Sequence, residues 1–240
     1  MKIIGWDTET YKGFVKVLTN SEGQYVESSD TLELLNFLFF NSKADYNVFF
    51  NIGYDLGSIL KPYIIENGEK LHNEFYQKIN AKEIKISDKE EEEGYYFKVE
   101  NYEIRFLNDK MFYLKKGKTR KFFWDTSNFY KSGFGHLSLD KASELYLGKR
   151  KNAEELGIDR RKIGEEEGYY EKNRELIIKY SIYDSILTKE LFERSINSYH
   201  NLGFKFPKKP FSEASIFKEY LNDKWDEEIK IAKELISSPY

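Results

Sequence analysis

The sequence opens on an apolar segment that ends abruptly in two acids. Ile3, Ile4 and Trp6 are typical of a buried strand, and Asp7 and Glu9 follow directly. In a strand, residues i and i+2 point to the same face, so the two carboxylates are expected to lie side by side. Two such groups resist ionising together unless a cation lies between them, and Mg²⁺ prefers oxygen ligands. Acids also end many strands without binding a metal, so a cation site at this strand requires other segments of the chain to supply further ligands.

Composition limits the other classes of protein. The 240 residues are 40% hydrophobic and 17% aromatic, which allows a substantial core in one large or two small domains. The absence of cysteine excludes disulfides, thiolate metal sites and cysteine nucleophiles. No apolar run approaches the ~18 residues of a membrane span, and Asp7 and Glu9 interrupt any signal peptide. We therefore expect a soluble, cytoplasmic protein without a membrane partner; the net charge of −3 neither indicates nor excludes nucleic-acid binding.

The first third of the chain predicts a mixed α/β order of strands and helices. Asp30 or Ser29 can cap a helix, with Glu33 in capping-box spacing. A second helix is expected from Asp55 and should stop near Pro62. Strands are predicted at 2–9, 13–19, 24–28 and 46–50.

The rest of the chain divides into an aromatic β-prone part and a helical part. Short antiparallel strands are predicted between 83 and 126, some of them extending the main sheet. Helices are predicted at 138–147, 171–200 and 213–237, the second stopping at Gly203. We expect a domain over 1–203 with a helical extension over 204–240 packed on it.

Two more acids have the chemistry of metal ligands. Asp55 ends the segment Asn-Ile-Gly-Tyr-Asp directly after an apolar strand, at the sheet edge where sites of α/β folds collect; the alternative is an ordinary helix cap. Asp184 shares one helical face with Leu176, Tyr180 and Leu187, so its carboxylate is expected to be buried. A buried carboxylate needs a metal or a partner, and the alternative is an ion pair with a buried Lys or Arg.

The order of these motifs resembles a known family of nucleases. Asp-x-Glu on a first strand, Asn-x-x-Tyr-Asp after a later strand and Tyr-x-x-x-Asp on a late helix are similar to the three exonuclease motifs of the DEDD family. Within that family, the chain resembles the proofreading 3′–5′ exonuclease domain of family B DNA polymerases. Tyr180 and Lys179, where the histidine sub-branch would place its His, favour the tyrosine sub-branch. The resemblance spans Asp7 to Asp184 and implies a ribonuclease H-like fold, a mixed five-stranded sheet flanked by helices.

The resemblance also implies an activity and roles for its residues. It implies a 3′–5′ exonuclease that hydrolyses single-stranded DNA from the 3′ end and releases nucleoside monophosphates, with two Mg²⁺ or Mn²⁺ ions. Asp7, Glu9 and Asp184 would hold one ion, Asp55 would support the second, and Tyr180 would orient the attacking water. Four residues match substrate contacts of the family: Thr10, Asn51, Tyr54 and Leu139. The nearest candidates for an assisting lysine are Lys149 and Lys151.

Several alternatives stay open. The chain could be a catalytically idle module that binds nucleic acid or a polymerase partner, or an exonuclease that trims RNA with the same chemistry. It could stand alone or work with a separate polymerase subunit. Basic clusters at 115–121, 149–151 and 160–162 could contact phosphates or simply be solvated loops.

Overall fold

A mixed sheet forms the centre of the protein, in a computed structural model that describes residues 1–80, 95–107, 110–132, 135–207, 210, 221 and 224–225. In chain order its strands are β1 (Ile3–Tyr11), β2 (Phe14–Asn20), β3 (Tyr25–Val26), β4 (Tyr46–Phe49), β5 (Tyr95–Val99), β6 (Tyr102–Leu107), β7 (Met111–Lys116) and β8 (Thr119–Asp125). They lie in the order β3-β2-β1-β4-β8-β7-β6-β5. The neighbours β1, β4 and β8 are parallel, and the other pairs are antiparallel.

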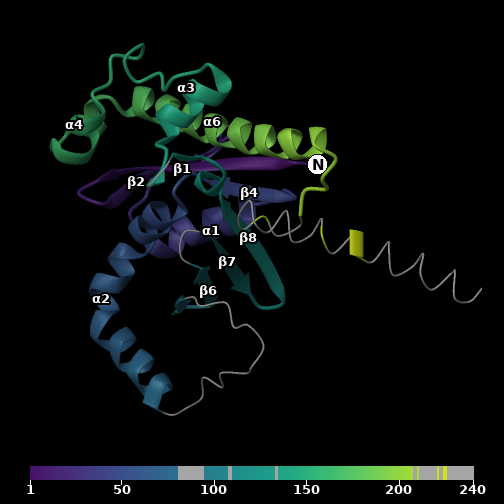
Figure 1. Ribbon diagram of the computed structural model, residues 1–240. Coiled ribbons are helices and arrows are strands. Elements are labelled where there is room, and N and C mark those ends of the chain that lie inside the picture. Colours follow the sequence, from purple (N-terminus) through teal and green to yellow (C-terminus); the bar gives the residue numbers. More distant parts are fainter. Residues whose placement is uncertain are drawn as a thin grey trace, which may run out of the picture.

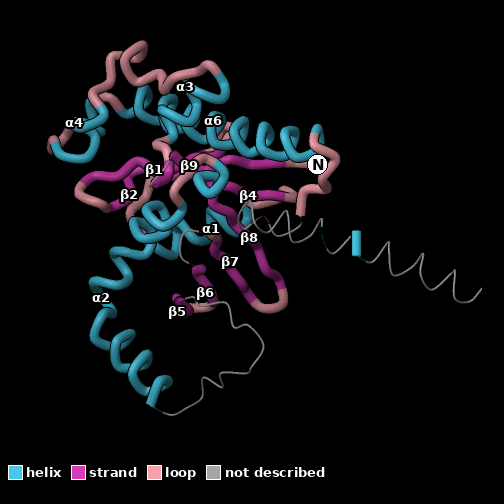
Figure 2. Tube along the Cα trace, in the orientation of Figure 1, coloured by secondary structure: helices cyan, strands magenta, loops and turns pink. Residues whose placement is uncertain are grey.

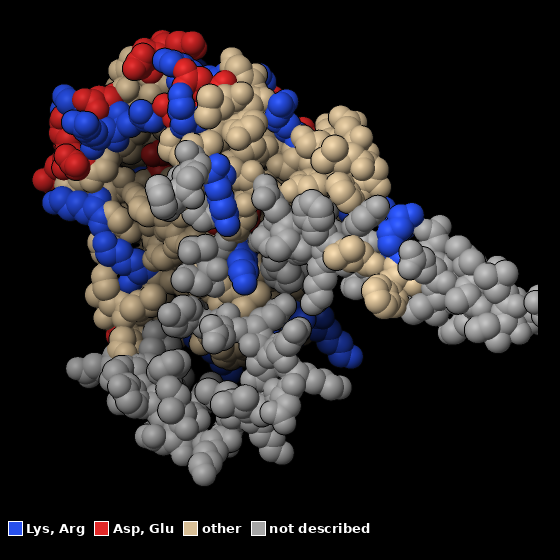
Figure 3. Space-filling view, viewed as in Figure 1, with Lys and Arg blue, Asp and Glu red and all other residues tan. Residues whose placement is uncertain are grey.

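Helices cover both faces of this sheet (Figures 1 and 2). They are α1 (Thr31–Asn41), α2 (Ile52–Asn80), the 3-10 helix η1 (Thr126–Phe129), α3 (Leu139–Leu147), α4 (Arg160–Glu165), α5 (Tyr169–Lys172) and α6 (Arg174–Asn201). Between η1 and α3, β9 (Lys131–Ser132) and β10 (Gly135–His136) form a small separate hairpin. Within the described ranges, no helix has the length and apolar character needed to cross a membrane. Acidic and basic side chains are intermixed on the surface around α3 and α4 (Figure 3).

The predicted α/β class with helices flanking a mixed sheet is confirmed, and the sheet has eight strands, because short strands of the region between 83 and 126 extend it. The three additional strands β5, β6 and β7 join at the outer edge of β8. They extend the sheet as an antiparallel meander, which suits the short aromatic segments of this region.

Side-chain alternation along β1 separates two cores. Ile4 and Trp6 point toward α1 and α2, where Phe49, Phe112 and Phe123 surround them. The centroids of the Phe112 and Phe123 rings are 4.6 Å apart and the rings stack, so part of the large aromatic content packs this core. Ile3 points to the opposite face, toward α3 and α6. Because side chains alternate, Asp7 and Glu9 continue the α6 face of the strand.

Local capping signals explain where two helices begin and end. The Asp30 carboxylate accepts a hydrogen bond from the Glu33 backbone N–H at 2.7 Å and starts α1. The Ser138 hydroxyl caps α3 in the same way, and Gly148 ends that helix with φ +67°, a conformation that favours glycine. Both helix starts were predicted from the sequence and are confirmed.

The predicted second helix is wrong at both ends. It runs from Ile52 to Asn80 instead of from Asp55 to near Pro62. It begins earlier because Asp125, far along the chain, accepts hydrogen bonds from the backbone N–H groups of Asn51 and Ile52. Proline lacks only one N–H and kinks a helix without always ending it, so Pro62 lies inside α2.

The chain after α6 turns back onto the sheet. Phe206 packs against Tyr46, Phe129 and Phe192, and the Tyr46 hydroxyl donates to the Pro207 carbonyl at 3.0 Å. This start of the predicted extension is therefore packed on the domain. Most of the helix predicted at 213–237 and the strand predicted from 83 lie outside the described residues.

Candidate metal centre

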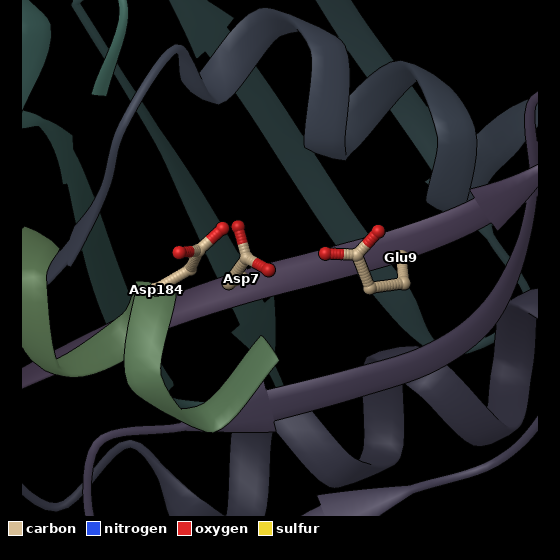
Figure 4. Close-up of side chains that lie close together, drawn as sticks. All are labelled: Asp7, Glu9 and Asp184. Carbon is tan, nitrogen blue, oxygen red and sulfur yellow. The ribbon is translucent and has the colours of Figure 1, made fainter. Parts of the chain in front are cut away.

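Three carboxylates from two elements meet beside β1. One oxygen from each of Asp7, Glu9 and Asp184 lies within 4.8 Å of the others. Figure 4 shows Asp7 and Glu9 on the same strand and Asp184 reaching them from α6. The sequence pattern predicted both the shared face of Asp7 and Glu9 and the burial of Asp184, which is fully buried.

Gly5 brings α6 close enough for this meeting. A Cβ atom added at Gly5 would lie 2.0 Å from the Ser185 carbonyl oxygen. Any other residue would therefore push the helix away from the strand, and Asp184 with it. The glycine sits two positions before Asp7, on the same strand face.

Small hydroxyl residues hold this contact in place. Thr19 of β2 bonds the hydroxyls of both Ser181 and Ser185 at 2.9 Å. Ser181 in turn donates to Asp7 Oδ2 at 3.0 Å. The bond to Ser181 was not foreseen, although Ser181 lies three residues before Asp184, next to it on the helix surface.

One lysine enters the group of acids. Lys151 Nζ forms an ion pair with Asp184 Oδ2 and donates to the Tyr180 hydroxyl at 3.1 Å. The alternative that Asp184 pairs with a buried cation is thus realised in this structure. A single ammonium group does not neutralise Asp7, Glu9 and Asp184 together.

The carboxylates remain electrostatically unfavourable despite Lys151. Burial, reinforced by the charge of Asp184, raises the pKa of Asp7 from 3.8 to about 7. Burial and the charge of Asp7 raise the pKa of Glu9 well above its ordinary value. Burial also raises the pKa of Asp184, although Lys151 opposes that shift. Carboxylates that are buried together repel one another when ionised, which raises their pKa values in the absence of a cation. A bound cation would favour the ionised forms and reverse this shift.

The residues present fit a hard divalent cation. All of the clustered donors are carboxylate oxygens, which Mg²⁺ and Mn²⁺ prefer. Asp184 Oδ1 is buried and has no hydrogen-bond partner, a costly state for a carboxylate oxygen. A cation beside Asp7 and Glu9 would satisfy this oxygen and offset their repulsion.

Asp55 lies beside the three clustered acids instead of among them. Its Oδ1 accepts the Thr8 hydroxyl at 2.6 Å, and its side chain is buried. Burial and the charge of Asp7 raise the pKa of Asp55 well above its ordinary value. Asp55 is not the cap of α2, since Asp125 takes that role.

Four of the predicted residues line one pocket of about 500 Å³ next to this group. They are Asp7, Asn51, Leu139 and Lys151. Asn51 adopts φ +67°, which turns the chain sharply between β4 and α2. The pocket opens beside the carboxylates, and its mixed polar and apolar wall suits a nucleoside.

The remaining predicted substrate residues lie apart from this pocket. Thr10 and Tyr54 share a hydrogen bond of 2.6 Å between their hydroxyls, and the Tyr54 side chain is 54% exposed. Lys149 does not join the acids, because its ammonium group binds Glu190 at 2.6 Å. Of the two candidate lysines, the structure places only Lys151 at the site.

Asp125 is a buried acid of this region that the sequence interpretation missed. It is the last residue of β8, whereas Asp7 lies in the middle of β1, two residues past Gly5, where the parallel pairing with β4 ends. The charge of Asp125 contributes to the raised pKa of Asp55. The tripeptide Trp-Asp-Thr at 6–8 recurs at 124–126, and this repeat could have revealed it. Because Asp125 holds the start of α2, it positions Asn51 and Asp55.

The raised pKa values predict that the stability of the metal-free protein depends on pH. Carboxyl groups with a higher pKa in the folded state bind more protons when folded, so their stabilising contribution is lost as pH rises through the folded pKa. We expect the urea midpoint in EDTA to fall between pH 5 and pH 8, with Asp7 titrating near 7. Mn²⁺ should reduce this fall by binding the folded state. A midpoint that rises across this range, or does not respond to Mn²⁺, would contradict the metal centre.

No family model matches the chain, and no curated protein matches its sequence. The class that the fold and the site define is therefore an α/β protein with a candidate carboxylate metal centre. Any function has to be proposed from the chemistry of that centre.

Proposed function

We propose that the protein is a metal-dependent 3′–5′ exonuclease that acts on single-stranded DNA. The observation that carries this proposal is the group formed by the carboxylates of Asp7, Glu9 and Asp184. Lys151 pairs with Asp184 in this group and donates a hydrogen bond to Tyr180. The residues come from motifs far apart in the chain and meet beside the interior strand β1, against α6. The order and spacing of those motifs resemble the DEDD exonucleases of the tyrosine sub-branch.

A ribonuclease H-like fold is part of the proposal. The inner strands β3-β2-β1-β4-β8 are five, of mixed direction, with α1 and α2 on one face and α6 on the other. They agree with the mixed five-stranded sheet that the resemblance implies. In this view β5, β6 and β7 are an addition at the outer edge.

Asp7, Glu9 and Asp184 would hold Mg²⁺ or Mn²⁺, and Asp55 would support a second ion. Ions of this kind supply an activated water and stabilise a leaving oxygen in phosphodiester hydrolysis. Lys151 fixes the carboxylate of Asp184, and its contact with Tyr180 places that hydroxyl at the edge of the group, where it would orient a water. The pocket at Asn51 and Leu139 would hold the terminal nucleoside.

Digestion of an oligonucleotide labelled at its 5′ end tests the proposal. We expect a ladder that shortens from the 3′ end with Mg²⁺ or Mn²⁺ and disappears in EDTA, since the carboxylates alone cannot activate water. An RNA oligonucleotide run in parallel reports the sugar preference. If neither substrate is shortened while the DNA is bound, the protein is instead a nucleic-acid binding module or requires a polymerase partner.

A further inference from the structure

The sheet extension carries two parallel rows of side chains on one face. Across β5 to β8, directly paired residues form an aromatic row of Tyr96, Arg105, Tyr113 and Phe122. Two residues along each strand, the same pairing forms a charged row of Lys98, Glu103, Lys115 and Arg120. Because side chains alternate along strands, both rows project from the same face.

This face is the one that also carries Asp7 and Glu9. Tyr113 and Phe122 pack at the border of the core under α6. The neighbouring lysines Lys116 and Lys121 point the other way, toward Asn36 and the Ser42 carbonyl near α1. The basic cluster at 115–121 is thus divided between the two faces of the sheet.

The rows remain accessible where α6 does not cover them. The helix α6 packs on β1, β2 and β4, and Figure 1 shows β6, β7 and β8 extending away from it. Tyr96 is 47% exposed, Lys98 and Arg120 are exposed, and Tyr113 and Phe122 are partly buried. Arg120 lies over the Tyr113 ring at 4.5 Å and so presents a flat cation beside the aromatic row.

The charged row is mostly basic, which favours a negatively charged partner. The charged row has three basic side chains, Lys98, Lys115 and Arg120, and one acid, Glu103, which pairs with Lys115 at 2.7 Å. Aromatic rings on strands, flanked by Lys and Arg, are the surface on which unpaired bases stack while cations contact the backbone. A duplex keeps its bases stacked inside and would not use the rings. From Phe122, three residues of β8 lead over about 10 Å to Asp125, which binds the start of α2 and whose charge acts on Asp55.

We propose that the two rows form a binding face for single-stranded nucleic acid, separate from the pocket at the carboxylates. On binding, the exposed Arg120 side chain would leave the Tyr113 ring, which it covers in this structure, and contact a phosphate. A base would then stack on Tyr113, and Lys115 would contact a further phosphate. This face would retain a strand at some distance from its 3′ end. The inference takes the strand to be the substrate of the proposed exonuclease, but its binding is measured without hydrolysis.

The experiment measures the affinity of a labelled oligothymidylate of about 20 nucleotides by fluorescence anisotropy in EDTA. We expect Tyr113→Leu to weaken binding about five- to hundredfold, the range for losing one stacked base. Arg120→Gln should also weaken binding and lower the slope of log affinity against log salt by about 0.7, one phosphate contact on a single strand. Lys121→Gln is the matched control, because it removes the same charge from the next residue on the opposite face. Urea midpoints verify that each variant is folded.

Hydrolysis separates this inference from the proposed function. With Mn²⁺, the Tyr113 and Arg120 variants should slow digestion of the long strand but not of a trinucleotide, which is too short to reach the rows. Normal digestion together with wild-type affinity in both variants would overturn the binding face and leave the exonuclease standing. Weakened binding without digestion by any protein would support the face and remove the exonuclease. Affinities that fall equally in the Lys121 control would overturn it as well, because the effect would then be general charge.

Discussion

Replacing Asp7 with asparagine is expected to abolish hydrolysis of a single-stranded DNA end, by at least about a thousandfold, because the candidate metal centre would lose one of its three clustered carboxylates. The same change should stabilise the metal-free protein at pH 8. Ionised Asp7 is unfavourable there, since its pKa is raised to about 7 by burial and by Asp184. The amide is nearly the same size and can still accept the Ser181 hydroxyl.

Two measurements on the Asp7→Asn protein are needed together. The digestion rate should fall to background, while the urea midpoint in EDTA at pH 8 should rise and lose its response to Mn²⁺. Asp45→Asn is the control, because Asp45 is an exposed acid that accepts the Lys2 N–H away from the clustered acids. Near-normal hydrolysis by the Asp7 variant would remove Asp7 from the metal centre.

Replacing Lys151 with methionine is expected to destabilise the protein by about 3–5 kcal/mol at pH 8, the cost of leaving one partner of a buried ion pair alone. The Lys151 side chain is 18% exposed and that of Asp184 is 1% exposed, so water screens this pair little. At pH 5 the loss should be smaller, since the raised pKa of Asp184 lets the carboxyl take up a proton instead. Hydrolysis should slow by about 10- to 100-fold, because Lys151 orients Asp184, a proposed metal ligand.

Lys149→Met is the matched control for this prediction. Lys149 lies two residues away and pairs with Glu190, but both side chains are exposed enough that the pair contributes about 0–1 kcal/mol. Urea denaturation at the two pH values and digestion rates with Mn²⁺ compare the two variants. Equal effects of the two substitutions would show that Lys151 has no special place in the site.

Much of the candidate metal centre could be predicted from local patterns. The alternation of β1 put Asp7 and Glu9 on one face, and the helical spacing of Tyr180 and Asp184 placed both on a buried face; the structure has both arrangements. The caps at Asp30 and Ser138 were equally local. These features depend on neighbours within one turn of helix or two residues of strand, which the sequence contains directly.

Other features depend on contacts between distant segments. No local pattern distinguishes Lys149 from Lys151, and only the path of the chain after α3 directs one to Glu190 and the other to Asp184. The early start of α2 depends on Asp125, more than seventy residues later, and the basic cluster at 115–121 divides only once β7 and β8 are paired.

The sequence by itself therefore determined which acids face inward, because periodicity decides the face of a strand or helix. The tertiary structure alone decided which of them meet and which cation joins them. Gly5 illustrates the reason. Its lack of a side chain matters only because the backbone of α6 packs directly against it in the folded protein. Contacts between distant segments stabilise the fold through the surface that they bury together. Local patterns in the sequence do not show which of these segments become neighbours.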